Sequence, residues 1–372
     1  KIISFYYGPT FYEYEMYVID FDATNRTFSL LEEMITVRPN VIRLADIDGD
    51  GFKEVVYTTS SNPVDSLNTK TIVLPKNNTD GTFYSDFQVL YETPTYPIGD
   101  INKDDKSDFY SYDQLTNLSH IILGETDYLN GFEKDILLDF SDMNGGNYDS
   151  HYTVAKSLGD VNGDGISDFS FFVENDVDMG QRFFFGNQTA LTTYDLLYDQ
   201  SLYGNHNLFQ TKNLGDINGD GFEDVAFVDT DKKYVKMFIN GNLSIKDFEL
   251  RIKNSKQIQL VESGDFNGDG LSDVAVFIND SETYSNVHVD FYLGNEDFDL
   301  TLDHSISFTS DLQLEFTIFP DGCGVKYLGD INEDGIDDFM LYGDSKAFIY
   351  YGGTNLSKTP DHTIFASKFF GA

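Results

Sequence analysis

The sequence predicts an all-β protein, a seven-bladed β-propeller of four-stranded antiparallel blades, on the strength of three observations. A nine-residue acidic loop occurs six times, and its copies start 49 to 65 residues apart, which fits the length of one four-stranded blade. Short runs of β-branched and aromatic residues flank the copies, as expected for strands. The composition, with 33 Phe, 24 Tyr and 31 Gly, favours strands and turns over helices.

Composition and charge narrow the function classes. The 372 residues carry 63 acids against 24 bases, a formal net charge of −39 that argues against binding to nucleic acid or to an anionic membrane. Apolar residues make up 40% of the chain, enough for a core, and no apolar run approaches the 18 residues of a membrane span. The one cysteine, Cys323, rules out a disulfide within the chain.

The expected strands follow in order from the first blade. Three strand-like runs, Ile2–Tyr6, Met16–Ile19 and Phe28–Leu31, precede the first loop and lack one strand of a blade. We expect Ala366–Gly371 to supply that strand, so that the two ends of the chain close one ring and residues 1–372 form one domain. The expected third strands lie near Met16–Ile19, Thr71–Leu74, His120–Leu123, Arg182–Phe185, Val235–Phe238, Val289–Leu293 and Ala347–Tyr351.

The repeated loop has the donor pattern of a site for a hard cation. In the copy that starts at Asp216, side-chain oxygens occupy positions 1, 3, 5 and 9, and glycine occupies position 6. Alternate positions of a tight turn converge on one point, the carbonyl of position 7 adds a ligand, and the ninth carboxylate closes the shell. Six to eight oxygens suit Ca²⁺ better than Mg²⁺. The closing acid at position 9 and the strand that follows distinguish this loop from an EF-hand, whose closing Glu is at position 12.

These repeats, of the form Asp-x-Asn/Asp-Gly-Asp-Gly-x-x-Asp, resemble the FG-GAP (integrin α-subunit N-terminal) and VCBS families. The resemblance covers nearly the whole chain and implies a β-propeller with calcium in the loops between the first two strands of its blades. Members serve in adhesion receptors, secreted surface proteins and modules attached to enzymes. The chain departs from integrin subunits, because it has no inserted metal-dependent adhesion domain, no Asp-x-Ser-x-Ser run and no blade disulfides.

The resemblance carries the ligand roles over position by position, with the seventh residue contributing its backbone carbonyl. The expected metal ligands are Asp46, Asp48, Asp50, Phe52 and Glu54; Asp100, Asn102, Asp104, Lys106 and Asp108; Asp160, Asn162, Asp164, Ile166 and Asp168; Asp216, Asn218, Asp220, Phe222 and Asp224; Asp265, Asn267, Asp269, Leu271 and Asp273; and Asp330, Asn332, Asp334, Ile336 and Asp338. We expect five to six Ca²⁺ sites. The second is the weakest, because Asp105 replaces the sixth-position glycine and Lys103 and Lys106 reduce the local negative charge.

Local signatures of catalysis are missing from the sequence. It contains no Gly-x-Ser-x-Gly elbow, phosphate-binding loop or His-Glu-x-x-His helix, and its six His residues are scattered without ligand spacing. We therefore predict that the chain is not an enzyme.

Seven Asn-x-Ser/Thr sequons point to the secretory pathway. Five of them fall in the expected connections between third and fourth strands, where they would be exposed. We expect N-glycosylation at several and an extracellular or cell-surface location reached through a eukaryotic secretory route. The sequons are Asn25, Asn77, Asn117, Asn187, Asn242, Asn279 and Asn355.

The most consistent function is a calcium-binding extracellular module for adhesion or surface-matrix interaction. A protein or glycan partner would bind the face opposite the calcium loops, made of Ser141–Tyr152, Gln200–Gln210 and Phe308–Gly324. Two alternatives stay open. The chain is a structural subunit of an extracellular filament, joined through Cys323 or unpaired terminal strands, or it is the propeller domain of a secreted polysaccharide-active enzyme. The candidate contacts on the partner face are Tyr148, His151, Tyr203, His206, Phe316 and Phe319.

Overall fold

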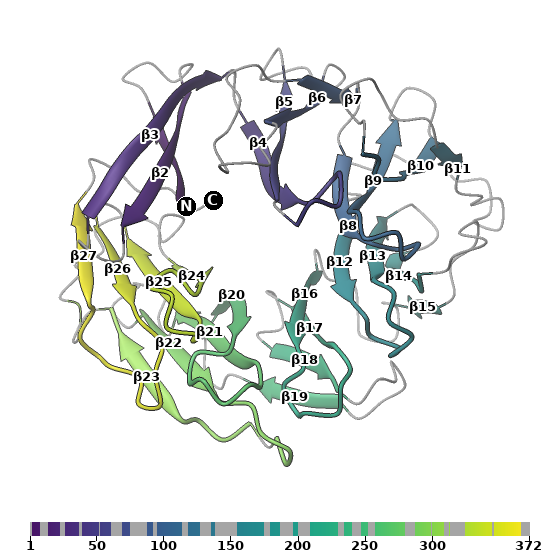
Figure 1. The fold of residues 1–372 in the computed structure, drawn as a ribbon. Coiled ribbons are helices and arrows are strands. Elements are labelled where there is room, and N and C mark those ends of the chain that lie inside the picture. The colour runs from purple at the N-terminus through teal and green to yellow at the C-terminus, as the bar shows by residue number, and fades with distance from the viewer. Residues whose placement is uncertain are drawn as a thin grey trace. The chain divides into compact units, whose positions relative to one another are not determined.

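All regular elements in the described part of the chain are β-strands (Figure 1). The structure is a computed structural model. No helix long and apolar enough to cross a membrane occurs among the residues it describes. It describes residues 2–7, 14–22, 27–36, 39–51, 53–60, 69–74, 88–91, 95–113, 118–126, 135–137, 155–174, 179–186, 196–199, 209–229, 234–239, 247–251, 257–279, 287–298, 300–308, 312, 324–343 and 346–365.

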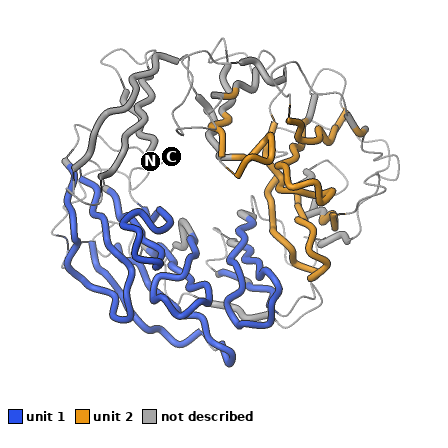
Figure 2. The backbone as a smooth tube through the Cα atoms, viewed as in Figure 1, with its two compact units in different colours: residues 1–36, 206–372 blue, residues 37–205 orange. Residues whose placement is uncertain are grey.

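The chain divides into two compact units, coloured separately in Figure 2. One consists of residues 1–36 and 206–372, and the other of residues 37–205. Each is built from small sheets whose strands follow one another along the chain. The prediction of one domain over residues 1–372 stays a prediction.

The unit of residues 37–205 contains three four-stranded sheets in which neighbouring strands pair antiparallel. Its strands are β4 (Pro39–Ala45), β5 (Glu54–Ser60), β6 (Thr69–Leu74) and β7 (Gln88–Tyr91); β8 (Thr95–Gly99), β9 (Asp108–Asp113), β10 (Leu118–Ile122) and β11 (Asp135–Leu137); and β12 (Ala155–Gly159), β13 (Asp168–Glu174), β14 (Met179–Phe184) and β15 (Leu196–Asp199).

The other unit contains one three-stranded and three four-stranded antiparallel sheets. Its strands are β1 (Ile2–Tyr7), β2 (Tyr14–Asp22) and β3 (Thr27–Thr36); β16 (Phe209–Gly215), β17 (Asp224–Asp229), β18 (Tyr234–Phe238) and β19 (Asp247–Arg251); β20 (Gln257–Gly264), β21 (Asp273–Asn279), β22 (Val287–Tyr292) and β23 (His304–Ser307); and β24 (Gly324–Gly329), β25 (Asp338–Gly343), β26 (Lys346–Tyr350) and β27 (His362–Phe365).

The all-β prediction is confirmed at the level of small antiparallel sheets. The three strand-like runs before the first loop form the three-stranded sheet β1–β3, and the seven expected third strands overlap β2, β6, β10, β14, β18, β22 and β26. The expected closing strand Ala366–Gly371 lies outside the described residues.

Apolar residues from consecutive sheets of one unit pack together to form the core. Phe266 and Phe291 of the β20–β23 region join Phe339 and Tyr350 of the next sheet in one buried cluster. Phe339 stacks on Tyr350 with ring centroids 4.9 Å apart. Burying whole aromatic side chains contributes about 1.5–3 kcal/mol each, so these clusters hold the strand ends that carry the acidic loops.

Candidate calcium loops

The six acidic loops occupy the same place in six sheets. Each begins after the first strand of a four-stranded sheet and ends with the first residue of the second strand, as between β4 and β5 or between β16 and β17. The expected ligand residues therefore lie in these turns, except that Phe52 is outside the described residues. The ninth-position acids Glu54, Asp108, Asp168, Asp224, Asp273 and Asp338 each start a second strand.

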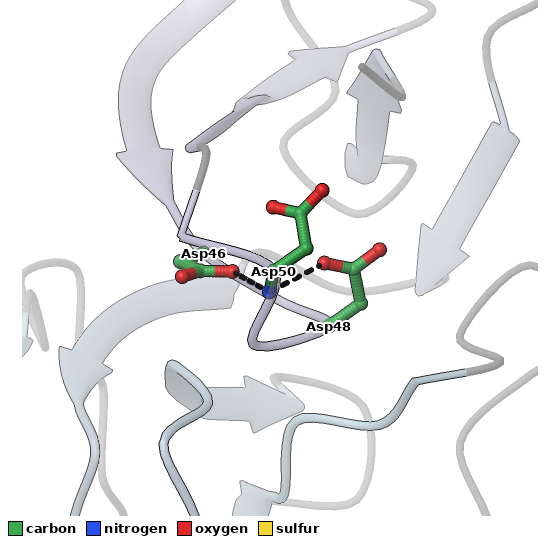
Figure 3. Close-up of side chains that lie close together, drawn as sticks. All are labelled: Asp46, Asp48 and Asp50. Atoms are coloured by element: carbon green, nitrogen blue, oxygen red, sulfur yellow. Dashed lines mark hydrogen bonds between the residues drawn. The ribbon is translucent and has the colours of Figure 1, made fainter. Parts of the chain in front are cut away.

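Loop 46–54 brings three carboxylates together. Asp46, Asp48 and Asp50 each place one carboxylate oxygen within 4.8 Å of the others (Figure 3). The backbone N–H of Asp50 donates to Oδ1 of Asp46 at 3.1 Å and to Oδ1 of Asp48 at 3.2 Å. Ligands of one Ca²⁺, each about 2.4 Å from the ion, lie no farther apart than about 4.8 Å. The spacing of these three oxygens therefore fits a shared Ca²⁺ ion.

The first-position carboxylate organises each loop by accepting backbone N–H groups. In loop 216–224, Asp216 accepts from Gly219 at 2.7 Å, from Asp220 at 3.2 Å and from Gly221 at 2.9 Å. The same three bonds occur in loops 46–54, 160–168 and 265–273. These backbone hydrogen bonds hold the shape of the turn that carries the expected ligands.

The backbone has positive φ at two positions of each loop. Gly219 and Gly221, at positions 4 and 6, have φ of 76° and 86°, values that an L side chain adopts at a cost. In loop 100–108, Lys103 and Asp105 adopt 63° and 65° without being glycine, and Glu333 adopts 62° at position 4 of loop 330–338. Positive φ at Asp105 was expected from the missing glycine at position 6, whereas positive φ at Lys103 and Glu333 was not.

Loop 100–108 also differs in its hydrogen bonds. In the other five loops the N–H of the fifth residue donates to the third side-chain oxygen, for example from Asp164 to Asn162 at 3.0 Å. Within the described part of the chain, the buried Oδ1 of Asn102 has no hydrogen-bond partner. Burying an oxygen that has no hydrogen-bond partner costs free energy unless a ligand interacts with it. A cation bound at this loop would be such a ligand.

The ninth-position acids are buried, and in loops 100–108, 160–168, 265–273 and 330–338 they accept backbone N–H groups from two directions. Asp168 is fully buried; its Oδ2 accepts from Val161 at 3.0 Å, and its Oδ1 accepts from Gly186 at 2.8 Å. Asp108, Asp273 and Asp338 make the same pair of contacts. This acid therefore ties the loop to the end of the third strand, a role that the sequence reasoning did not assign to it.

Burial raises the pKa of these acids. Desolvation raises the pKa of Glu54, Asp108, Asp168 and Asp273 to about 7 and that of Asp338 to about 6, with backbone hydrogen bonds acting in the opposite direction. The other acids of the same loop add repulsion. The ionised carboxylates are thus held at a cost in free energy that a nearby cation would offset.

Two further features of the repeat position the loops. The second residue is apolar and, in loops such as 46–54 and 216–224, fully buried, as at Ile47 and Ile217. The glycine after the third strand leaves no room for a side chain, because a Cβ at Gly186 would lie 2.4 Å from the carbonyl oxygen of Ser167. In the sequence this glycine follows Phe185 at the end of an expected third strand, but its spatial role could not be inferred from that order.

The donor set fits Ca²⁺. Carboxylate, amide and carbonyl oxygens are the ligands of hard cations, and no nitrogen or sulfur ligand is among the expected donors. Three carboxylates gather in loop 46–54, and in the other loops an asparagine replaces one of them.

A comparison with known protein families supports the assignment of the acidic loops to a repeated unit. Residues 216–276 match the FG-GAP-like repeat. The matched stretch contains the FG-GAP-like loops 216–224 and 265–273 together with strands β17 to β20. The match is to the repeat in general and does not single out the integrin α-subunit group. A search of curated proteins found no match in sequence.

Solved structures resemble the chain in fold at low identity. The periplasmic gluconolactonase of Pseudomonas aeruginosa has a TM-score of 0.58 and 8% identity, covering 99% of this chain and 97% of that one. A protein of Bacteroides fragilis described as a 6-phosphogluconolactonase has a TM-score of 0.53 and 10% identity, covering 98% and 95%. The FG-GAP-like match and these structures together support a propeller-type repeat fold.

The prediction that the chain is not an enzyme is wrong, because the solved structures with its fold include lactonases. The inference rested on missing local motifs. Loops of a repeat fold that are far apart in sequence can assemble a catalytic site without leaving such a motif, and a fold alone does not fix function.

Of the seven sequon asparagines, two lie among the described residues. Asn355 lies in the β26–β27 connection with an exposed side chain, and Asn279 ends strand β21. The remaining five sequon asparagines lie outside the described residues, as do Cys323 and the six candidate contacts of the partner face.

Proposed function

We propose that the chain is a calcium-binding extracellular β-propeller that presents a surface for adhesion or surface-matrix interaction. Calcium occupies the acidic loops, with loop 100–108 the weakest site. In this proposal the loops act structurally: the ions neutralise clustered acids and hold the first strand of each sheet to the second. A protein or glycan partner binds on the connections opposite the loops.

The observation that carries the proposal is the recurrence of one loop at one place in six sheets. Each copy joins the first two strands, and a first-position acid in each accepts N–H groups from the turn. Acids gathered at six such turns repel one another unless cations compensate them. The orphan oxygen of Asn102 and the buried ninth-position acids add to that requirement.

The proposal includes a ring of seven blades closed by both ends of the chain. The six four-stranded sheets and the three-stranded sheet β1–β3 supply the strands for it. The first sheet needs one more strand to match the others, and residues after Phe365 are available for that role. A truncation after residue 365 that leaves the melting temperature unchanged would contradict this closure.

Thermal melting with and without calcium tests the cation part of the proposal. Protein dialysed free of divalent ions should melt at a lower temperature than protein with millimolar Ca²⁺, because an ion that binds only the folded state stabilises it. Mg²⁺ at the same concentration is the matched control and should restore less, since it demands a stricter octahedron. Identical melting curves without divalent ions, with Ca²⁺ and with Mg²⁺ would reject the calcium part of the proposal.

Partner capture tests the interaction part separately. The calcium-loaded chain, immobilised and offered to a glycan panel and to extracellular matrix proteins, should retain a ligand that Tyr148→Ala or Tyr203→Ala loses while the calcium-dependent melt is kept. Loss of binding through changes in the calcium loops alone, with the aromatic variants unaffected, would place the interaction elsewhere.

A further inference from the structure

Neighbouring calcium loops of one unit are joined by direct backbone hydrogen bonds. In the unit of residues 37–205, the N–H of Ser107 donates to the carbonyl of Asp46 at 2.7 Å, and the N–H of Ser167 donates to the carbonyl of Asp100 at 2.9 Å. In the other unit, Ser272 donates to Asp216 at 2.9 Å and Asp337 donates to Asp265 at 3.0 Å. The eighth residue of each later loop thus holds the first residue of the loop before it.

The eighth-position side chain strengthens two of these contacts. Oγ of Ser107 accepts the N–H of Asp46 at 3.2 Å, and Oδ2 of Asp337 accepts the N–H of Asp265 at 2.9 Å. Tyr327 in turn donates its hydroxyl to Oδ1 of Asp337 at 3.1 Å. Both backbone groups of the first-position residue are therefore fixed by the following loop.

In three of the four contacts, a glycine precedes the first position and makes room for the next loop. A Cβ at Gly215 would lie 2.1 Å from Oγ of Ser272, and one at Gly99 would lie 2.7 Å from Cβ of Ser167. At Gly264 the Cβ would lie 2.7 Å from the ring of Tyr327. In these three pairs the close approach of the two loops uses a missing side chain at the end of the first strand, whereas Ala45 precedes Asp46 in the fourth.

We propose that calcium binding in neighbouring loops of one unit is coupled through the eighth-position residue. The inference rests on the proposed calcium function and adds a regulation of the same sites. The first-position carboxylate is an expected ligand and organises its own turn, and its backbone is held by the next loop. Ordering one loop with calcium therefore orders the first ligand of the preceding loop, and the reverse holds by linkage.

Double-mutant cycles on the rise in melting temperature caused by calcium test this coupling. Asp269→Asn and Asp334→Asn weaken the adjacent loops 265–273 and 330–338 while keeping the side-chain shape. If the loops are coupled, the double variant loses less of the calcium-induced rise than the sum of the two single losses. Asp220→Asn with Asp334→Asn is the matched control, because loop 265–273 lies between their two loops in the sequence. The losses of calcium-induced rise in melting temperature in this pair should be closer to additive than those in the adjacent pair.

Variants of the contact itself complete the test. Asp337→Ala keeps the backbone bond to Asp265 and removes the side-chain bond, so in this background the non-additivity of the adjacent pair should shrink. Asp337→Ser, which introduces the serine found at position 8 of loop 100–108, should keep more of it. Additive losses in the adjacent pair of the unmodified chain overturn the coupling and leave the calcium function standing. Equal non-additivity in the adjacent pair and in the control pair overturns the route through the eighth-position residue. A chain whose melting temperature does not rise with calcium contradicts both the proposed function and the coupling.

Discussion

At the scale of single residues, the ninth-position acid is a structural acceptor of backbone N–H groups as well as an expected ligand. The repeated pattern predicted it as a closing ligand, and the structure shows in addition that it receives buried N–H groups from the loop and from the third-strand glycine. The pattern was sufficient to predict the loop because ligands and turn glycines are local in sequence. The contact to Gly186 spans 18 residues and depends on strand pairing, so it could not be read from spacing alone.

Truncating this acid should cost more than truncating an exposed acid of the same loop. Asp168→Ala leaves the N–H groups of Val161 and Gly186 without their acceptor, and two unsatisfied buried groups cost about 2–6 kcal/mol. Asp164→Ala, whose side chain is exposed, should change the calcium-free stability by less than about 0.5 kcal/mol. Urea unfolding of both calcium-free variants measures the difference, and equal losses would contradict the role assigned to Asp168.

The raised pKa values predict how the calcium-free protein responds to pH. Folding raises the pKa of Asp108, Asp168 and Asp273 from 3.8 to about 7, so between these values the folded chain holds protons that the unfolded chain has released. Stability should therefore fall as pH rises from about 4 to about 7. Urea unfolding of calcium-free protein at pH 5 and pH 7 measures this, and greater stability at pH 7 would contradict it.

Replacing the strained residue Asp105 of loop 100–108 by glycine should stabilise the protein. Asp105→Gly removes a side chain at φ of 65°, which should stabilise the protein by about 1 kcal/mol and tighten calcium binding at this loop. Gly221→Ala is the reverse control, because its φ is 86° and nothing lies within 4 Å of the added Cβ, so that any loss reflects the backbone alone. A lower melting temperature for Asp105→Gly would contradict the strain argument.

At the scale of elements, first strands of one unit are joined by an ion-pair cluster. Glu262 on β20 is 3% exposed in its side chain and contacts Nζ of Lys212 on β16 at 2.6 Å and Nζ of Lys326 on β24 at 3.3 Å. All three pair with the second strand two residues after its ninth-position acid. The sequence showed a strand pattern at each site, but no local signal indicated that these charges meet.

Removing the central charge should loosen the three strands. Glu262→Gln keeps the volume and loses two charge-assisted hydrogen bonds, and because both lysines are partly exposed and can hydrate, the expected loss is about 1–2 kcal/mol. Lys212→Met, at the shorter contact, should cost more than Lys326→Met. Chemical unfolding of the three variants checks that order, and an unchanged stability for Glu262→Gln would contradict it.

At the scale of the whole molecule, the proposed calcium ions would offset part of the large negative charge. The formal net charge is −39, and six bound Ca²⁺ ions would leave about −27, still strongly acidic but with the densest clusters neutralised. The sequence predicted the small antiparallel sheets because each is made of consecutive strands with local turns. The proposed partner surface could be predicted only as a set of long connections, because residues on such connections follow no sequence period.

The most direct measurement of the central claim is the number of calcium ions bound per chain. Purified protein is equilibrated by dialysis against micromolar Ca²⁺ with excess Mg²⁺, and bound metal is determined by elemental analysis. We predict five to six calcium ions per chain, one for each acidic loop, with the weakest at loop 100–108. A chain that retains no calcium under these conditions would contradict the account.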